Sequence, residues 1–203
     1  MIAIVDYGLG NLGSISNMLK AIGEKSLITH ERDKIEAADK ILLSGVGAFD
    51  AGVKNLEERN LMDFLREQAK KGKPILGICL GMQLLGRKSE EGSCSGLGLM
   101  PFDSIRFRIP EGIHLKVPHM GWDIVTFKQE NPLLEGIEGK QRYYFAHSYH
   151  VKCDSEDNIL MTCDYGYEFC AAVVKDNIYG VQFHPEKSHD FGMRLLKNFA
   201  GRC

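Results

Sequence analysis

Short apolar runs alternate with amphipathic segments through the first 85 residues, and this alternation constrains the fold more than any other feature. Runs of aliphatic residues predict strands at 2–5, 26–29, 40–43 and 74–78. Apolar residues at helical spacing predict helices over 12–22 and 52–71, with Gly23 and Gly72 after their last turns. Because parallel strands need helical crossovers, we expect an α/β fold with a mostly parallel central sheet flanked by helices.

The pattern changes after residue 104, where short alternating runs predict an added antiparallel or mixed section. These runs lie at 104–108, 123–127, 143–145, 149–152, 160–162, 170–174 and 178–182. Asp176-Asn177 separates the last two and is typical of a hairpin turn. A helix is predicted over 189–199. No repeat, low-complexity tract or linker interrupts the sequence, so we expect residues 1–203 to form a single domain.

Composition excludes several classes of function. Lys plus Arg is 25 and Asp plus Glu is 27, which gives no electrostatic basis for binding nucleic acid or a membrane surface. No apolar stretch has the length of a membrane span or the features of a secretion signal, so we expect a cytoplasmic protein. None of the six cysteines forms a CxxC pair, and the histidines show no zinc spacing with them. We therefore expect free thiols, with neither a metal nor a cofactor.

The segment Gly77-Ile78-Cys79-Leu80-Gly81 follows a predicted strand and opens a predicted helix. This arrangement is typical of a nucleophile elbow, with cysteine in the place of serine. Small flanking residues relieve crowding in such a turn, and the helix N-terminus favours a thiolate over a thiol. The N–H of Leu80 would then serve as one oxyanion donor. A buried cysteine between two packing glycines is the alternative interpretation.

A partner for Cys79 lies near the other end of the chain, in Gln182-Phe183-His184-Pro185-Glu186. His184 comes just after a predicted strand, at the edge of a parallel sheet where ligands gather. An imidazole can take the thiol proton and return it to a leaving amine, and Glu186 can orient that imidazole. We expect Pro185 to hold these two side chains in an extended relation.

These motifs and their order along the chain resemble the class I, or triad, glutamine amidotransferases. Within that family the chain is similar to the glutaminase subunit of imidazole glycerol phosphate synthase of histidine biosynthesis. The resemblance runs nearly from end to end, through residues 6–11, 45–49, 77–84, 118–122, 145–149 and 183–188. It implies hydrolysis of glutamine to glutamate and ammonia by a Cys79, His184 and Glu186 triad, inside a heterodimer with a barrel-shaped cyclase that consumes the ammonia.

The resemblance also implies roles for other residues. Gly45-Val46-Gly47 is similar to the oxyanion strand of the family, and Val46 and Gly47 would help to form the oxyanion site. Gly47, Gln83 and the segment His147-Ser148-Tyr149 match positions that hold the substrate. Positions that match those facing the partner are Tyr7, Asn11, His119, Met120, Trp122, Tyr144 and Lys187. Without the family, Gln83 reads as a solvated residue and Tyr149 as a core residue, while Trp122 is equally compatible with an interface anchor and with core packing.

Two residues depart from the family pattern. Ser44 stands where proline usually precedes Gly-Val-Gly, so the oxyanion loop should be softer. Asp123 stands where asparagine commonly follows Gly-Trp, and it adds a negative charge near the expected docking face. The segment 186–193 looks more like a paralogous group that supplies ammonia to a sugar amidotransferase in surface-polysaccharide synthesis. Both groups share the same glutaminase chemistry.

Three other functions compete with this interpretation. Gly8-Leu9-Gly10-Asn11-Leu12-Gly13 has the form of a dinucleotide-binding fingerprint, and Glu31 follows the second predicted strand. That hypothesis leaves the elbow and the His-Pro-Glu motif without a role, so we expect no nicotinamide or flavin to bind. A cysteine hydrolase with another substrate and a non-catalytic interaction subunit are the other two.

Overall fold

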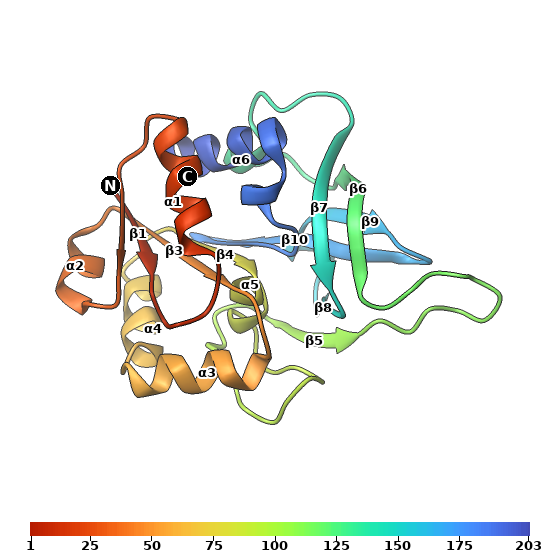
Figure 1. The fold of residues 1–203 in the computed structure, drawn as a ribbon, viewed down its shortest axis with the longest axis horizontal. Coiled ribbons are helices and arrows are strands. Elements are labelled where there is room, and N and C mark those ends of the chain that lie inside the picture. Colours follow the sequence, from red (N-terminus) through yellow and green to blue (C-terminus); the bar gives the residue numbers. More distant parts are fainter.

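A mixed sheet of eleven strands forms the centre of the molecule. The computed structural model describes residues 1–203, with helices on both sides of the sheet (Figure 1). The strand order is β2-β1-β3-β4-β11-β10-β9-β6-β7, and β5 and β8 extend from β10 beside this path. The predicted fold class is confirmed, because a parallel half continues directly into an antiparallel half.

The first half of the chain supplies the parallel strands and most of the helices. Its strands are β1 (Ile2–Val5), β2 (Ser26–Thr29), β3 (Lys40–Gly45) and β4 (Ile75–Cys79). Its helices are α1 (Leu12–Ala21), α2 (Arg32–Ala37), α3 (Phe49–Glu58), α4 (Met62–Lys70) and α5 (Leu80–Leu84). Each of β1, β3 and β4 pairs in parallel with its neighbour, so their carboxyl ends meet at one edge of the sheet.

The second half supplies the antiparallel strands. They are β5 (Phe102–Arg106), β6 (His119–Phe127), β7 (Gln141–His147), β8 (Tyr149–Cys153), β9 (Ile159–Asp164), β10 (Glu168–Lys175) and β11 (Ile178–Val181). The helical elements are the 3-10 turns η1 (Pro132–Leu134), η2 (Glu156–Asn158) and η3 (Pro185–Lys187), and α6 (His189–Arg202). Strand β11 joins the two halves, because it runs antiparallel to β10 and parallel to β4.

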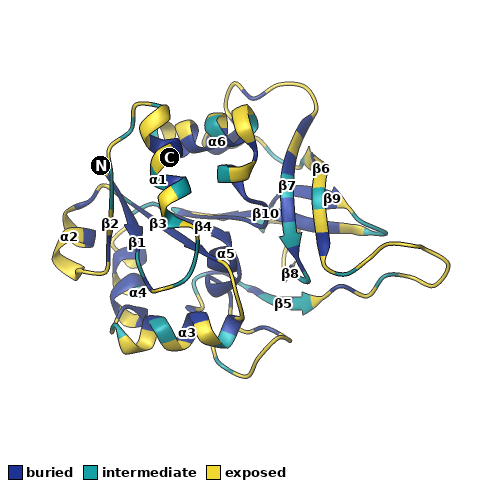
Figure 2. Cartoon of the chain, in the orientation of Figure 1, coloured by how far each residue is buried: buried dark blue, intermediate teal, exposed yellow.

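Alternation along the strands divides the core into two layers. Ile2 and Ile4 of β1 face a cluster that includes α1 and α6, whereas Ala3 and Val5 face a cluster that includes α2, α3 and α4. The inner faces of these helices are buried, and their outer faces are exposed (Figure 2). A parallel strand covered on both faces must be apolar at successive positions, as the sequence of β1 is.

Two details differ from the sequence predictions. The helix expected over 52–71 is two helices, because Asn60 takes a left-handed backbone conformation with φ +55° between α3 and α4. The short helix α2 was not predicted, since its six residues bury only Ile35 and show no clear period. The hairpin turn at Asp176-Asn177 is confirmed, with Asp176 at φ +52° between β10 and β11.

The tight contacts at Gly81 generate a prediction about stability. A Cβ atom at Gly81 would lie 1.7 Å from the Leu43 carbonyl oxygen of β3, whereas one at Gly13 in α1 would meet no atom within 4 Å. We expect Gly81→Ala to lower the free energy of unfolding by about 3 kcal/mol, since backbone must move to admit the methyl group. Gly13→Ala is the matched control and should raise it by about 0.5–1 kcal/mol. Urea denaturation measures both, and equal effects would contradict the assignment of crowding to Gly81.

Candidate active site

Cys79 lies at the turn between β4 and α5. Its backbone has φ +54° and ψ −112°, a strained conformation for a residue with a side chain. The turn closes only because both flanking residues lack side chains: a Cβ atom at Gly77 would lie 2.7 Å from the Gly81 carbonyl oxygen and from Met82. The sequence prediction of an elbow at Cys79 therefore matches the backbone geometry.

His184 reaches Cys79 because β11 and β4 are neighbours in the sheet. Val181 pairs with Ile78, so both strands end at the same level and their following residues meet. The backbone N–H of His184 donates to the Tyr144 carbonyl at 2.9 Å. The hydroxyl of Ser188 donates to the His184 carbonyl at 2.6 Å and accepts from the N–H of Tyr144 at 3.0 Å. These bonds hold the backbone that carries the imidazole.

Glu186 orients the His184 ring. Nδ1 of His184 lies 2.7 Å from Oε1 of Glu186, and the two side chains are 1% and 2% exposed. With Nδ1 donating to the carboxylate, Nε2 remains for the Cys79 sulfur. Pro185 starts the 3-10 turn η3, so the expected extended relation between the two side chains is wrong, and a tight turn brings the carboxylate back to the ring instead.

The surroundings of His184 strongly favour its charged form. Burial lowers its pKa, but the hydrogen bonds to the Cys79 sulfur and the Glu186 carboxylate outweigh burial and raise the pKa from 6.5 to about 10. A histidine that stays protonated in this way is suited to pair with a thiolate and to deliver a proton to a leaving group.

A cavity of about 350 Å³ opens above the Cys79 sulfur. The predicted oxyanion and substrate residues Val46, Gly47, Leu80, Gln83, His147, Ser148 and Tyr149 all line it. Sequence reasoning missed Glu91, Pro118 and Ala146 in the wall. It also missed Gln182, whose Nε2 lies 3.8 Å from the Cys79 sulfur; no sequence pattern pointed to this contact, because the two residues are 103 positions apart.

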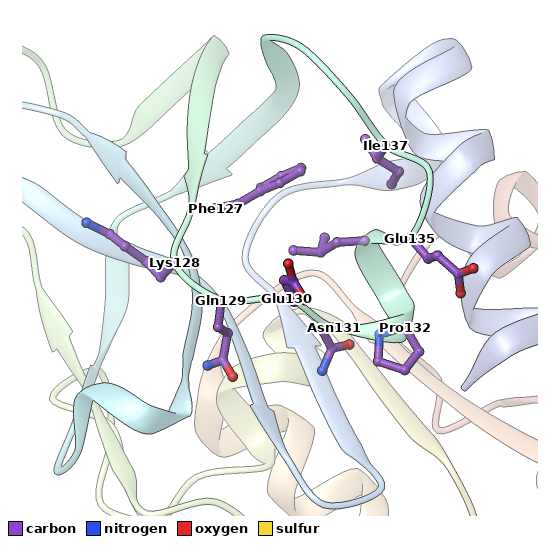
Figure 3. A pocket seen from close by; sticks show the side chains of 9 residues that line it. Phe127, Lys128, Gln129, Glu130, Asn131, Pro132, Glu135 and Ile137 are labelled. Carbon is purple, nitrogen blue, oxygen red and sulfur yellow. The ribbon is translucent and has the colours of Figure 1, made fainter.

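A second, larger cavity of about 730 Å³ lies between the end of β6 and η1 (Figure 3). Its lining comes from residues 127–137, including Phe127 and Ile137, and contains neither cysteine nor histidine. The size of a cavity is a weaker guide to chemistry than the groups that line it. The cavity above Cys79 is therefore the candidate active site.

Comparison with known proteins agrees with this geometry. A family model described as "Glutamine amidotransferase class-I" matches residues 3–203. The chain belongs to the class I glutamine amidotransferase family. The chain is 51% identical over 200 residues to "Imidazole glycerol phosphate synthase subunit HisH 2" of Pseudomonas aeruginosa, covering 98% of each sequence. The protein of that name from Methanococcus maripaludis has the same identity and coverage.

Solved structures agree on the fold. A structure titled "Crystal structure of glutamine amidotransferase" superposes with a TM-score of 0.75 at 18% identity, covering 98% of this chain and 97% of that one. This likeness concerns the fold, whereas the family follows from the sequence match over residues 3–203. No helix in the structure is long and apolar enough to cross a membrane.

The dinucleotide fingerprint of this amidotransferase lacks one physical requirement. In nucleotide-binding folds the third glycine lets the helix pack closely on the strand. A Cβ atom on Gly13 would meet nothing within 4 Å, so no close packing depends on that glycine. Gly10 has a different function here, because a Cβ atom there would lie 2.9 Å from the Ser44 carbonyl oxygen at the end of β3.

The residues expected to face a partner fall into two groups. Met120, Trp122 and Ile124 alternate along one face of β6, with 63%, 38% and 52% of their surface exposed. Tyr144 of β7 is paired with Trp122 of β6, and the Lys187 ammonium lies 5.6 Å from the Tyr144 ring. Figure 1 shows β6 and β7 together at one end of the molecule. Asn11 is also exposed, and its side chain accepts from the Ser14 N–H as the N-cap of α1.

Tyr7 and His119 require a correction. Both side chains are fully buried, so neither forms part of a surface that a partner could touch directly. The Tyr7 hydroxyl lies beneath Gly45 without a hydrogen-bond partner, and burial raises its pKa. The Asp123 carboxylate, which is 40% exposed, contacts the His119 ring at 2.8 Å on the opposite face of β6 from Trp122.

The pKa of His184 gives a testable pH dependence. Because its folded-state pKa is raised, its contribution to stability is fully present below pH 6.5 and is lost as pH rises through about 10. Glu186→Gln removes one of the two groups that raise the pKa, so it should lower both the pKa and this stability difference. NMR titration of His184 and urea unfolding across the pH range measure the two effects. Glu138→Gln, at an exposed position, is the control; an unchanged pKa in Glu186→Gln would contradict the assignment.

Proposed function

We propose that this chain is a glutaminase subunit that hydrolyses L-glutamine to L-glutamate and ammonia, and that it supplies an imidazole glycerol phosphate synthase in histidine biosynthesis. The observation that carries the proposal is the contact of the strained Cys79, which lines the cavity, with the buried His184–Glu186 pair. The similarity to the named synthase subunits supports the choice of pathway. Residues 1–203 would form one domain and act in the cytoplasm.

The first half of the reaction forms a thioester. The Cys79 thiolate attacks the side-chain amide carbon of glutamine, and the carbonyl oxygen becomes an oxyanion. The N–H of Leu80 and the backbone at Val46 and Gly47, which line the cavity, would stabilise that oxyanion. The carbon–nitrogen bond then breaks as the His184 imidazolium transfers its Nε2 proton to the departing ammonia.

The second half releases glutamate. His184, now neutral, removes a proton from a water molecule that attacks the thioester carbon, and the carbon–sulfur bond breaks to restore the thiolate and the imidazolium. Glu186 keeps Nδ1 protonated throughout, so Nε2 performs both transfers. Gln83, His147, Ser148 and Tyr149 would bind the amino-acid end of glutamine, because they line the same cavity at its other wall.

We propose that the partner is a cyclase subunit that docks on the exposed face of β6 and β7. Met120, Trp122, Tyr144 and Lys187 lie there, together with the exposed Ile124. Met120 also lines the active-site cavity, so a partner on this face would lie at the mouth of that cavity, where the ammonia leaves. An aromatic and aliphatic surface of this kind is suited to a protein partner rather than to solvent.

A test of the chemistry compares two cysteine variants. Cys79→Ala should abolish release of glutamate and ammonia, because no other group can form the thioester. Cys203→Ser, at the last residue of the chain, is the control and should retain activity. Glutamate is measured with the histidine-pathway cyclase and its ligand present. Residual activity in Cys79→Ala would contradict the triad, and stimulation only by a sugar amidotransferase would instead support the paralogous role.

A test of the docking face uses two exposed apolar residues. Trp122→Ala should weaken binding of the cyclase by roughly 30-fold or more, the loss of about 2 kcal/mol typical of a central aromatic anchor. Ile28 is similarly exposed, at 39%, but lies on β2 at the opposite edge of the sheet, so Ile28→Ala should leave binding unchanged. Calorimetric titration measures both; equal affinities for the two variants would exclude β6 as the docking face.

A further inference from the structure

A continuous series of hydrogen bonds leads from Asp123, on β6 next to the edge strand β7, to the sulfur of Cys79. Between these two ends, and outside the proposed triad, it passes through the buried side chains of His119, His147, Gln83 and Gln182. Tyr149 contributes only its backbone carbonyl. The contacts are Asp123 Oδ2 to His119 Nε2 (2.8 Å), His119 Nδ1 to His147 Nε2 (3.1 Å), His147 Nδ1 to Tyr149 O (2.7 Å), Gln83 Nε2 to Tyr149 O (3.2 Å), Gln83 Nε2 to Gln182 Oε1 (3.1 Å) and Gln182 Nε2 to Cys79 Sγ (3.8 Å).

The Tyr149 carbonyl fixes the direction of this series, because a carbonyl oxygen only accepts hydrogen bonds. His147 must therefore carry its proton on Nδ1. Burial, the largest influence, holds the pKa of His147 well below 6.5, so the ring is neutral and its Nε2 is an acceptor. His119 must then donate from Nδ1 to His147. The amide of Gln83 is fixed in the same way, with Nε2 toward the carbonyl.

The same logic fixes the number of protons at the Asp123 end. His119 already donates from Nδ1, so a neutral ring would present the lone pair of Nε2 to a carboxylate oxygen 2.8 Å away. That contact is favourable only if a proton lies between the two atoms, as an imidazolium with a carboxylate or as an imidazole with a carboxylic acid. Either way, the pair holds one proton more than an ordinary ionised aspartate and a neutral histidine.

Removal of that proton would break the series somewhere along its length. With Asp123 ionised and His119 neutral, His119 would turn its single proton toward the carboxylate. Its Nδ1 lone pair would then face the lone pair of His147, and a shift of the His147 proton only moves the conflict to the Tyr149 carbonyl. Two of the residues affected, His147 and Tyr149, line the proposed glutamine cavity.

The surroundings of His119 leave Asp123 as its only charged neighbour. The ring is fully buried and is stacked between Phe145 and Tyr165, with centroids at 4.7 and 3.9 Å. Burial lowers the pKa of His119, and Asp123 acts against it. The other titratable groups that face this region are His147 of β7, His150 of β8, Cys163 of β9, Tyr165 and, farther along the series, His184.

We propose that Asp123 and His119 are positioning residues for the glutamine site, and that the proton they share lets His147 keep its own proton on Nδ1, toward the Tyr149 carbonyl. The proposal rests on the proposed function only for the statement that the cavity binds glutamine. Asp123 follows Trp122 in β6 but points to the opposite face of the sheet, so the series begins on the strand that carries the proposed docking residues.

The first experiment reads the protons directly. Nitrogen-15 NMR of the histidine rings in the intact chain shows which ring nitrogen is protonated. We expect His119 to carry a proton on Nδ1 at low pH and to lose it in one step as the pH rises. In Asp123→Asn the carboxamide donates to Nε2, so Nδ1 stays protonated and the step disappears. The absence of this step in the wild type, or the same step in Asp123→Asn, would overturn the proposal.

The second experiment connects the proton to glutamine. In the complex with the cyclase, the KM for glutamine of the wild type should rise about fivefold over the same step, the change expected for one lost hydrogen bond of about 1 kcal/mol. Asp123→Asn should show no such rise, and kcat should follow the same pH profile in both. Asp164→Asn removes an exposed carboxylate next to Cys163 and should behave as the wild type.

The two experiments separate the failure of the inference from that of the proposed function. If the NMR step is found but the chain neither binds nor hydrolyses glutamine, the proposed function fails and the shared proton remains. If glutamine is hydrolysed but the KM profiles of the wild type and Asp123→Asn coincide, the positioning role is overturned.

Discussion

The crowded turn between β4 and α5 is the constraint on which the rest of the site depends. The helix returns so closely over β3 and β4 that Gly77 and Gly81 have no room for a Cβ atom. Between them Cys79 is held at φ +54°, a conformation that costs free energy and persists only because the packed sheet on both sides supports it. The sulfur therefore stands at the carboxyl edge of the sheet in a single orientation, and every other group of the site is arranged around it.

The position of β11 converts this elbow into a site. The last strand enters the sheet between β4 and β10, parallel to one and antiparallel to the other. Its parallel pairing places His184 at the level of Cys79, and the 3-10 turn at Pro185 folds Glu186 back to the ring. On its other side the antiparallel strands carry His147 and Tyr149 to the same cavity. The two halves of the mixed sheet thus contribute different parts of one site.

The histidines of this region are all buried, and their neighbours decide whether the pKa of each one rises or falls. His184 has two acceptors, the sulfur and a carboxylate, and they raise its pKa in spite of burial. His147 has only a carbonyl and other histidines for neighbours, so burial prevails and its pKa falls. For His119, burial lowers the pKa and the carboxylate of Asp123 partly offsets that effect. The same side chain therefore supplies a charged group, a neutral link and a shared proton within one connected network.

The sequence by itself determined the α/β class, the elbow at Cys79 and the His184-Pro185-Glu186 motif as its candidate partner, because these depend on local patterns: alternating apolar runs, glycines beside a nucleophile, and a strand followed by His-Pro-Glu. Only the tertiary structure decided what depends on distant neighbours. Burial of Tyr7 and His119 follows from strands that pair far apart along the chain, and the contact of Gln182 with Cys79 spans 103 residues. The break at Asn60 and the inward turn of Asp123 likewise follow from packing, which no local pattern encodes.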